Sequence, residues 1–367
     1  MDSLTYSYYT STNAYYNGQQ INRLQEVEDK AGATAYPLDF EGTSEYFYDN
    51  IGNLITDTRD SIKEIVWTTY GKVSKVERES GCKKPDLEFL YDPLGNRLCK
   101  IVKPRPAGIP TNQNEWTFTW YLRDTQGNIM GVYTETHDED DAYLSTNEFP
   151  MYGSARLGVQ NASDTLSHIT YTQSTFDADG FYTSSYENVP LNEPDTNSYH
   201  YYPLQKQYEL SNHLGNVLAT VSARPRLIFD NQTFQYKEAD VLSVNDYYPF
   251  GSTMPSRSWD SGQGYRFAFN GKEKITDWDG KMGTYDFDAR LLNALTGRWN
   301  SPDKLEAKYP NMSTYGFIGN NPIIAIDPNG RDIYIVIQNA TDDKSKIQKN
   351  NHEQIISWLA SSERVMQ

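Results

Sequence analysis

The sequence predicts an all-β protein, and three observations lead to this class: alternating apolar and polar side chains, recurring glycine-containing turns, and many tyrosines. Residues 116–122 place Trp116, Phe118 and Trp120 on one side with threonines between them, which is the period of two that a strand requires. The 29 tyrosines among 367 residues suit half-buried strands, because the ring is apolar and its tip is polar. Helical periodicity is almost absent before residue 340.

A strand–turn–strand unit recurs along the first two thirds of the chain. Turn-forming residues at 123–128 separate the strand at 116–122 from a second apolar stretch at 129–136. We expect a β-hairpin there, with Gly127 supplying the positive φ of its turn. The fullest copy of the unit lies at 91–98. Shorter or looser copies lie at 48–54, 70–73, 121–130 and 208–218. Such a series predicts stacked hairpins with loops of variable length.

The composition excludes several classes of function. The formal charge is −16, from 33 basic and 49 acidic side chains, which argues against a protein that binds nucleic acids or anionic membranes by charge. No apolar run is long enough to span a membrane, and residues 1–20 carry no secretory signal. Two cysteines, Cys82 and Cys99, are too few for a disulfide framework; they either pair once or stay free.

The copy at 91–98, Tyr-Asp-Pro-Leu-Gly-Asn-Arg-Leu, resembles the YD repeat of the RHS (rearrangement hot spot) family. Residues 246–251, 265–273, 289–303 and 309–330 resemble, in the same order, segments of the RHS repeat-associated core of that family. The core motifs include Pro249, Phe250, Gly251, Gly297, Arg298, Asn321 and Pro322. Repeats and core together cover most of the chain.

The resemblance implies a strand–turn–strand ribbon that spirals into a shell, or part of one, closed by the core and enclosing a variable C-terminal effector, usually a toxin. We therefore expect a YD-repeat shell segment at 1–245, the core at 246–330 and the start of an effector domain at 331–367. The chain is short for a complete shell in this family. The resemblance also implies secretion or display at the cell surface, competition with bacteria or a host, and an immunity protein and a secretion apparatus as partners.

The sequence changes in character after Gly330. Residues 331–367 carry five basic and five acidic side chains, so the whole charge of −16 lies in residues 1–330. Isoleucine at every second position from 333 to 337 predicts a buried strand, and a capping-box pattern beginning at Asn350 predicts a helix. One strand and one helix cannot bury a core of their own, which favours a truncated α/β effector domain. A tail that packs on the shell is the alternative.

The resemblance further implies a self-cleaving site of the aspartic-protease type. Such a site needs two neighbouring carboxyl groups that share one proton, so that one acts as base on a water and the other as acid. By motif position, Asp303 and Asp327 match the two carboxyl groups, and Arg290 matches an arginine that holds one of them ionised. The junction consists of Gly330, Arg331 and Asp332, with the scissile bond after Arg331.

Three residues depart from the family pattern at this site. Arg331 stands where cleaving members carry leucine, Lys304 replaces a proline and Asn293 replaces an aspartate. A charged Arg331 would fit an apolar pocket poorly, so slow cleavage or none is expected. A purely structural role is the alternative for both aspartates, because Asp303 follows a proline and Asp327 begins a Pro-Asn-Gly turn.

No metal or cofactor site is predicted, and beyond self-cleavage no conventional enzyme is indicated. Residues 137–141 hold metal-like donors without regular spacing, which favours an acidic, solvated loop. The five histidines are scattered, and phosphate-binding and nucleophile-elbow motifs are absent. Two rival functions remain: a surface adhesin or carbohydrate-binding repeat protein with exposed aromatic rings, and a glycoside hydrolase with two carboxylates in a cleft.

Overall fold

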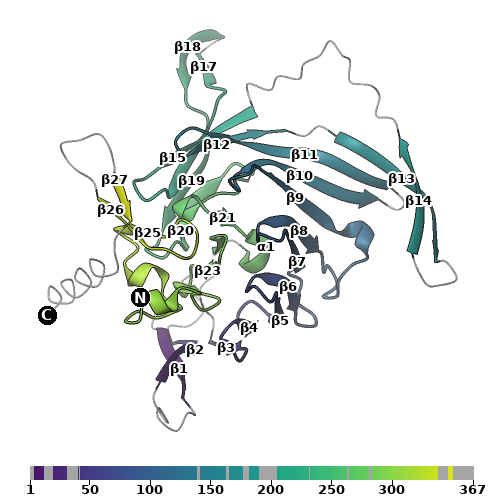
Figure 1. The fold of residues 1–367 in the computed structure, drawn as a ribbon. Coiled ribbons are helices and arrows are strands. Elements are labelled where there is room, and N and C mark those ends of the chain that lie inside the picture. Colours follow the sequence, from purple (N-terminus) through teal and green to yellow (C-terminus); the bar gives the residue numbers. More distant parts are fainter. Residues whose placement is uncertain are drawn as a thin grey trace. The chain divides into compact units, whose positions relative to one another are not determined.

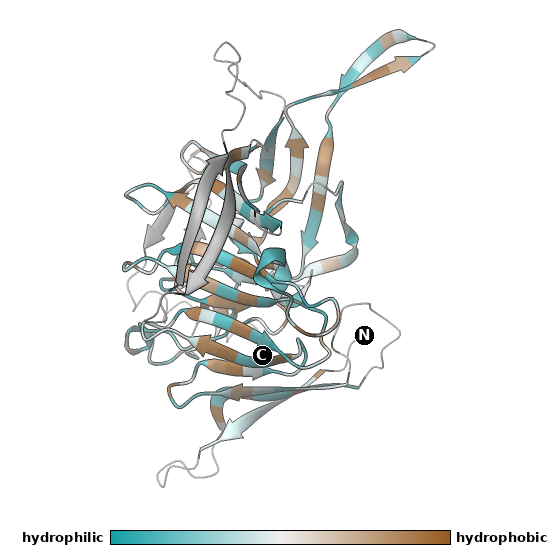
Figure 2. Cartoon of the chain, turned by 90° about the vertical axis from the view of Figure 1, so that its right-hand side faces the viewer, coloured by the Kyte–Doolittle hydropathy of each residue, from teal (hydrophilic) through white to brown (hydrophobic). Residues whose placement is uncertain are grey.

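Strands dominate the computed structural model of the chain (Figure 1), so the predicted all-β class is confirmed. The structure describes residues 4–11, 20–30, 40, 42–138, 141–162, 165–176, 182–189, 205–230, 232–262, 264–280, 283–337 and 346–349. In this part of the chain the only α-helix is α1 (Thr276–Asp279), and no helix there is long and apolar enough to cross a membrane. Apolar and polar bands alternate along the strands (Figure 2), as the period of two requires.

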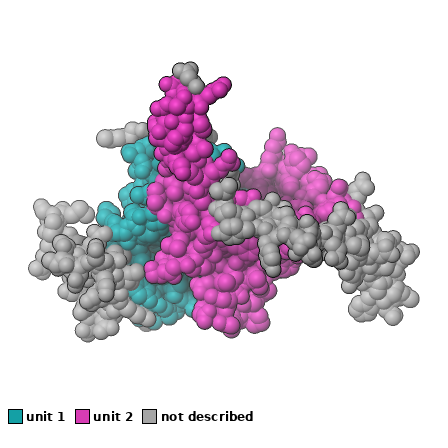
Figure 3. All heavy atoms as spheres, turned by 90° about the horizontal axis from the view of Figure 1, so that it is seen from above, with its two compact units in different colours: residues 1–73, 211–218, 244–367 teal, residues 74–210, 219–243 magenta. Residues whose placement is uncertain are grey.

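The chain forms two compact units, coloured separately in Figure 3. Unit 1 contains residues 1–73, 211–218 and 244–367, and unit 2 contains residues 74–210 and 219–243. Unit 1 thus combines the predicted core segment at 246–330 with strands from the beginning of the chain. The domain boundaries at 245 and 330 remain predictions.

Unit 2 consists of antiparallel strands, most of which pair with a neighbour along the chain. Its strands are β6 (Val73–Arg78), β7 (Asp86–Tyr91), β8 (Arg97–Lys103), β9 (Thr117–Arg123), β10 (Ile129–Asp138), β11 (Asp141–Tyr152), β12 (Arg156–Asn161), β13 (Thr165–Phe176), β14 (Tyr182–Val189), β15 (Lys206–Ser211), β16 (Val217–Ser222), β17 (Arg226–Asp230) and β18 (Thr233–Glu238), with the 3-10 turn η1 (Gln113–Glu115). Strands β6 to β11 pair in sequence order, and β11 then pairs with both β12 and β13. The pairing of β9 with β10 confirms the hairpin predicted around Gly127, whose φ is +89°.

Unit 1 contains three sets of paired antiparallel strands, of which the second and third are small sheets of four and three strands. The first pairs β1 (Leu4–Thr10), β2 (Gln20–Asp29), β3 (Thr43–Tyr48), β4 (Leu54–Asp57) and β5 (Ile62–Trp67) in order. The second pairs β21 (Glu273–Lys274), β22 (Thr284–Asp286), β23 (Leu291–Asn293) and β24 (Arg298–Trp299), and the third pairs β25 (Ala325–Ile326), β26 (Tyr334–Ile337) and β27 (Lys346–Lys349). The remaining elements are β19 (Val241–Tyr247), β20 (Thr253–Asp260), and the 3-10 turns η3 (Phe269–Gly271), η4 (Glu306–Lys308) and η5 (Phe317–Asn320).

An aromatic cluster forms the centre of the core segment in unit 1. Phe287, Trp299 and Phe317 are fully buried and contact one another edge to face, with ring centroids 5.1–5.5 Å apart. Phe269 and Tyr285 extend the cluster. Buried aromatic pairs of this kind add stabilisation beyond the area they bury, and here they fix the short strands that carry the candidate site.

The repeat unit has a structural counterpart in a shared turn. In the copy at residues 92–96, Oδ1 of Asp92 accepts the backbone N–H groups of Leu94 and Asn96, and Nδ2 of Asn96 donates to Oδ2 of Asp92 at 2.8 Å. Gly95 has a φ of +85°, which glycine adopts without strain. The copies that begin at Asp49 and Asp124 make the same set of hydrogen bonds. The Asp-x-x-Gly-Asn motif is therefore a turn that closes on itself.

Two expectations about other segments are revised. The predicted strand near residue 335 is observed as β26, but Ile333 and Ile335 are half-buried, not buried. The predicted acidic loop at 137–141 is the end of a hairpin, in which Asp138 pairs with Asp141; cross-strand pairing of β10 and β11 overrides the local charge pattern. Residues 139–140 and the helix predicted from Asn350 lie outside the described residues.

Candidate functional site

Arg290 lies at the centre of a polar cluster at the end of the core segment. It directly precedes β23, and its guanidinium lies over the ring of Trp299, 4.2 Å from the centroid. Nε donates to the carbonyl oxygen of Gly330 at 2.6 Å, and Nη1 donates to that of Thr314 at 3.3 Å. The side chain is buried, so these contacts replace water around a charge that is costly to bury unpaired.

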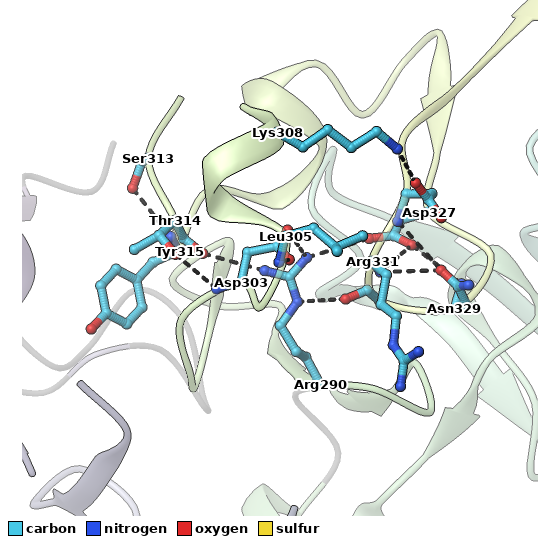
Figure 4. A network of polar contacts seen from close by, with 12 residues as sticks. Arg290, Asp303, Leu305, Lys308, Ser313, Thr314, Tyr315, Asp327, Asn329 and Arg331 are labelled. Carbon is cyan, nitrogen blue, oxygen red and sulfur yellow. Dashed lines mark hydrogen bonds and ion pairs between the residues drawn. The ribbon is translucent and has the colours of Figure 1, made fainter. Parts of the chain in front are cut away.

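The two predicted carboxyl groups meet at one nitrogen of this arginine (Figure 4). Nη2 of Arg290 lies 3.0 Å from Oδ2 of Asp303 and 3.6 Å from Oδ2 of Asp327. Because both distances end on the same atom, one cationic group serves both carboxyl groups. The structure thus brings together all three residues that the sequence singled out.

Local turns hold both aspartates. Oδ1 of Asp303 accepts the backbone N–H of Leu305 at 2.8 Å, and the backbone N–H of Asp303 donates to Oγ1 of Thr314 at 2.7 Å. Asp327 begins a turn similar to that at Asp92, because its Oδ1 accepts the N–H groups of Asn329 and Arg331 at 3.2 and 3.0 Å. Both aspartates therefore stabilise turns, as the structural alternative predicts. The Oδ2 atom of each still contacts Arg290.

Burial distinguishes Asp327 from the repeat turns. Its side chain is 2% exposed, and this burial raises the pKa of the carboxyl group, although the charge of Arg290 and the backbone N–H donors act in the opposite direction. Burial also lowers the pKa of Arg290, while both aspartates oppose that change. The guanidinium remains charged because its ordinary pKa is far above neutrality. The cluster therefore combines a fixed cation with a carboxyl group that retains its proton more readily than usual.

Two cavities adjoin the cluster. The smaller, of about 20 Å³, is lined by Arg290, Asp303, Asp327 and Ile333, together with residues of the 306–318 segment. Its volume is enough for one water molecule, and its lining supplies the polar partners that such a water needs. The larger, of about 230 Å³, is lined by Asp303, Gly330 and Arg331 and by the turns at 51–53 and 69–71.

The junction residues lie beside the cluster. Gly330 is buried and accepts from Arg290, whereas Oδ1 of Asp332 pairs with Nζ of Lys308 at 2.5 Å. The side chain of Arg331 is exposed at the rim of the larger cavity. The expectation that Arg331 brings an uncompensated charge into an apolar pocket is wrong, because the backbone hydrogen bonds of the turn direct its side chain to solvent.

The residues of the core motifs have structural roles. A Cβ at Gly251 or Gly297 would lie within 3 Å of the ring of Phe269 or Phe250, respectively, and both glycines have positive φ. The guanidinium of Arg298 lies over the ring of Tyr315. Pro249 lies in the turn that begins at Tyr248, and Asn321 and Pro322 follow η5. Oδ1 of Asn293 accepts the N–H groups of Leu295 and Thr296. Although asparagine replaces the family's aspartate here, its side chain still accepts the hydrogen bonds of the turn.

Sequence reasoning missed two residues of the site. Thr314 contacts both Asp303 and Arg290, and Trp299 stacks on Arg290. Neither follows a spacing rule, because both contacts depend on how distant segments pack. In the described part of the chain, no group of three or more His, Cys, Asp or Glu side chains is arranged to hold a metal ion.

Comparisons with known proteins give similarity at low identity. No family model matches the chain. Salivary gland surface protein 1 of Aedes aegypti is 25% identical over 286 residues, which cover 77% of this chain and 6% of that protein. The tRNA3(Ser)-specific nuclease WapA of Bacillus spizizenii is 21% identical over 308 residues, which cover 80% of this chain and 11% of that protein. The chain therefore spans only a small part of the length of these relatives.

Solved structures of Tc toxin components also resemble the chain. A crystal structure of TcdB2-TccC3-Cdc42 aligns with 17% identity and a TM-score of 0.44, covering 89% of this chain and 13% of that chain. The Photorhabdus luminescens Tc holotoxin pore aligns with 15% identity and a TM-score of 0.36, covering 95% of this chain and 18% of that chain.

Proposed function

We propose that this chain is part of an RHS-type shell protein that encloses and presents a C-terminal toxin or effector, and that its core cuts the polypeptide at the Gly330–Arg331–Asp332 junction. The observation that carries the proposal is the cluster of Arg290, Asp303 and Asp327 beside that junction, in which Arg290 and Asp327 are buried and Asp303 is half-buried. The hairpins with a shared turn and the ordered core motifs support the shell. The relative named as a nuclease supports a toxin as the kind of effector.

In the proposed cleavage, the two carboxyl groups exchange one proton with the substrate. A water in the larger cavity, which both Asp303 and Arg331 line, attacks the carbonyl carbon of Arg331, and Asp303 takes its proton as general base. Asp327, whose pKa is raised by burial, gives its proton to the departing amide nitrogen of Asp332. The peptide bond breaks, a carboxyl group forms on Arg331 and an amine on Asp332. The pair of aspartates again holds one proton, so no cofactor is consumed.

Arg290 is a positioning residue in this proposal. Its Nε donates to the Gly330 carbonyl, and its Nη2 contacts Oδ2 of both aspartates. The junction backbone is held as well, because the N–H of Arg331 donates to Asp327.

The test is the intact mass of the purified chain over time. Cleavage is expected to give residues 1–331 and 332–367, and Asp303→Asn and Asp327→Asn are each expected to abolish it. Asn at 327 retains the oxygen that accepts the N–H groups of the turn. A loss of cleavage in this variant would therefore show that the reaction needs the proton of the Asp327 carboxyl group. Asp92→Asn changes a similar turn in unit 2 and is expected to cleave normally. Normal cleavage by Asp327→Asn, or a wild-type chain that stays intact, would overturn the proposed chemistry.

A second candidate function is glycan binding, and one observation favours it. A groove of about 980 Å³ in unit 1 is lined by the rings of Tyr9, Phe47 and Tyr48 and by the charged side chains of Arg23 and Glu306. Aromatic rings beside polar groups suit stacking on sugars. Binding on a glycan array that is lost in Phe47→Ala would support this function, and absence of binding would remove it.

A further inference from the structure

The β17–β18 hairpin is a separate two-stranded sheet that belongs to unit 2 (Figure 1). Leu227, Phe229, Phe234 and Tyr236 are 48–56% exposed, although Phe229 and Phe234 contact each other with ring centroids 6.0 Å apart. An isolated hairpin is at best marginally stable in water. Its exposed apolar side chains therefore indicate a surface that another strand or chain covers.

The outer edge of β17 is free in the described structure. Within that part of the chain, β17 pairs with β18 alone, so its other edge presents unpaired backbone N–H and C=O groups. Such an edge is a template for a further strand. The sequence Arg-Leu-Ile-Phe-Asp contains no proline or lysine, which are common blocks on an edge, although the strand is short and a register shift lies between Ile228 and Phe229.

The order of charges along β17 matches a second copy of itself. An antiparallel pair centred on Ile228 places Arg226 of each copy opposite Asp230 of the other, and Leu227 opposite Phe229. We propose that β17 pairs with β17 of a second copy, giving a dimer with two-fold symmetry and a continuous four-stranded sheet. Both charges are exposed, and the described structure gives neither of them an ion-pair partner within the chain.

Two alternative contacts of the hairpin, pairing through β18 and insertion into a membrane, agree less well with its sequence. Pairing of β18 with itself places Lys237 opposite Phe234 and forms no opposite-charge pair. Pairing of β17 with β18 of another copy is a head-to-tail contact, which would build rings or open filaments and not a two-fold dimer. Asp230 lies next to the hairpin turn, so insertion into a bilayer would bury a carboxylate, and the chain charge of −16 opposes anionic lipids.

Charge exchange tests the pairing. The five-residue edge is a small interface, so a dimer fraction that rises with concentration is expected in analytical ultracentrifugation at physiological ionic strength. Arg226→Asp places aspartates opposite each other, and Asp230→Arg places arginines opposite each other, so each variant alone is expected to be monomeric. Mixing the two variants restores both opposite-charge pairs and is expected to give a heterodimer. Each change is on the surface, so folding is retained.

A cysteine on the symmetry axis tests the register. Directly opposed residues in an antiparallel pair have Cα atoms about 4.5–5.5 Å apart, which is within disulfide range. Ile228→Cys is therefore expected to form an oxidised dimer on non-reducing gels. Leu227→Cys is the matched control and should stay monomeric, because its equivalent in the other copy is out of reach.

Four results would overturn the inference. Three of them concern association: a wild-type chain that remains monomeric at all concentrations, charge variants that associate like the wild type, or equal cross-linking at 227 and 228. Flotation of the wild-type chain with phosphatidylserine vesicles, lost on Phe229→Asp, would assign the hairpin to membranes and would also overturn it.

Discussion

At the scale of single residues, Asp327 and Asp92 show how burial changes the chemistry of one motif. Both begin turns in which Oδ1 accepts the N–H groups of the second and fourth following residues. Asp92 lies near the surface, whereas Asp327 is buried beside Arg290. The same turn therefore has a structural role in the repeats, whereas in the core it positions a carboxyl group whose pKa is raised by burial.

The first prediction concerns the pH dependence of cleavage. Burial raises the pKa of Asp327, and the proposed acid must hold its proton to act. Cleavage is expected to slow as pH rises through this raised pKa, because the acid loses its proton. Quantifying fragments by mass spectrometry across a pH series checks this. A rate that increases steadily with pH would contradict the role of Asp327 as acid.

Asp57 gives a second residue-scale prediction. It is fully buried, and burial together with the charge of Asp60 raises its pKa to about 7, although Arg59 acts in the opposite direction. The folded state thus binds a proton that the unfolded state releases near pH 4. Its contribution to stability is full below that pH and is lost as pH rises towards 7.

The variant Asp57→Asn removes this titration. Asn retains an oxygen for the N–H groups of Arg59 and Asp60, so the turn is kept. We expect the variant to be stabilised relative to the wild type at about pH 8, by up to about 4 kcal/mol, and much less at about pH 4. Urea denaturation at both pH values measures the difference, and equal differences at the two would refute the raised pKa.

At the scale of elements, the repeat turn is a cooperative set of hydrogen bonds. Asp92→Ala removes the acceptor of two backbone N–H groups and of the Asn96 side chain, so a loss of about 1 kcal/mol in the free energy of unfolding is expected. Asp92→Asn should cost less, because Asn212 already occupies the equivalent place in the turn at 212–216. Chemical denaturation of both variants checks the order, and equal losses would contradict it.

Elements were predictable from the sequence where the information is local. The hairpin around Gly127 follows from period two and a turn-forming segment, and both are properties of neighbouring residues. The approach of Arg290, Asp303 and Asp327 followed only from a family resemblance, since the three lie on separate turns. Thr314, and the burial that shifts Asp57, were not predictable, because they depend on packing between segments far apart in the chain. The acidic residues at 137–141 led to the prediction of a loop, whereas residues 137, 138 and 141 pair in the β10–β11 hairpin.

At the scale of the whole molecule, the core segment is completed by residues from elsewhere in unit 1. The backbone N–H of Leu54 donates to the carbonyl of Asn300 at 2.9 Å, and the hydroxyl of Tyr315 donates to that of Gly52 at 2.7 Å. On another side, Nδ2 of Asn270 donates to the carbonyl of Leu214 at 3.0 Å. A repeat turn and a strand from the first part of the chain thus satisfy polar groups of the core, which would otherwise be exposed or unpaired.

The last prediction follows from this arrangement. A fragment of residues 244–337 retains the aromatic cluster but loses the partners at 40–73 and 211–218, so it is expected to lack a cooperative unfolding transition and sharp near-ultraviolet circular dichroism. In the intact chain, Tyr315→Phe removes the hydroxyl that donates to Gly52 and contacts Arg23, and it should cost about 1 kcal/mol while the fold is kept. Adding residues 40–73 in trans should restore part of the near-ultraviolet signal, because it resupplies the Gly52 carbonyl and the Leu54 N–H. A fragment that unfolds cooperatively without these residues would show that the core is an independent domain after all.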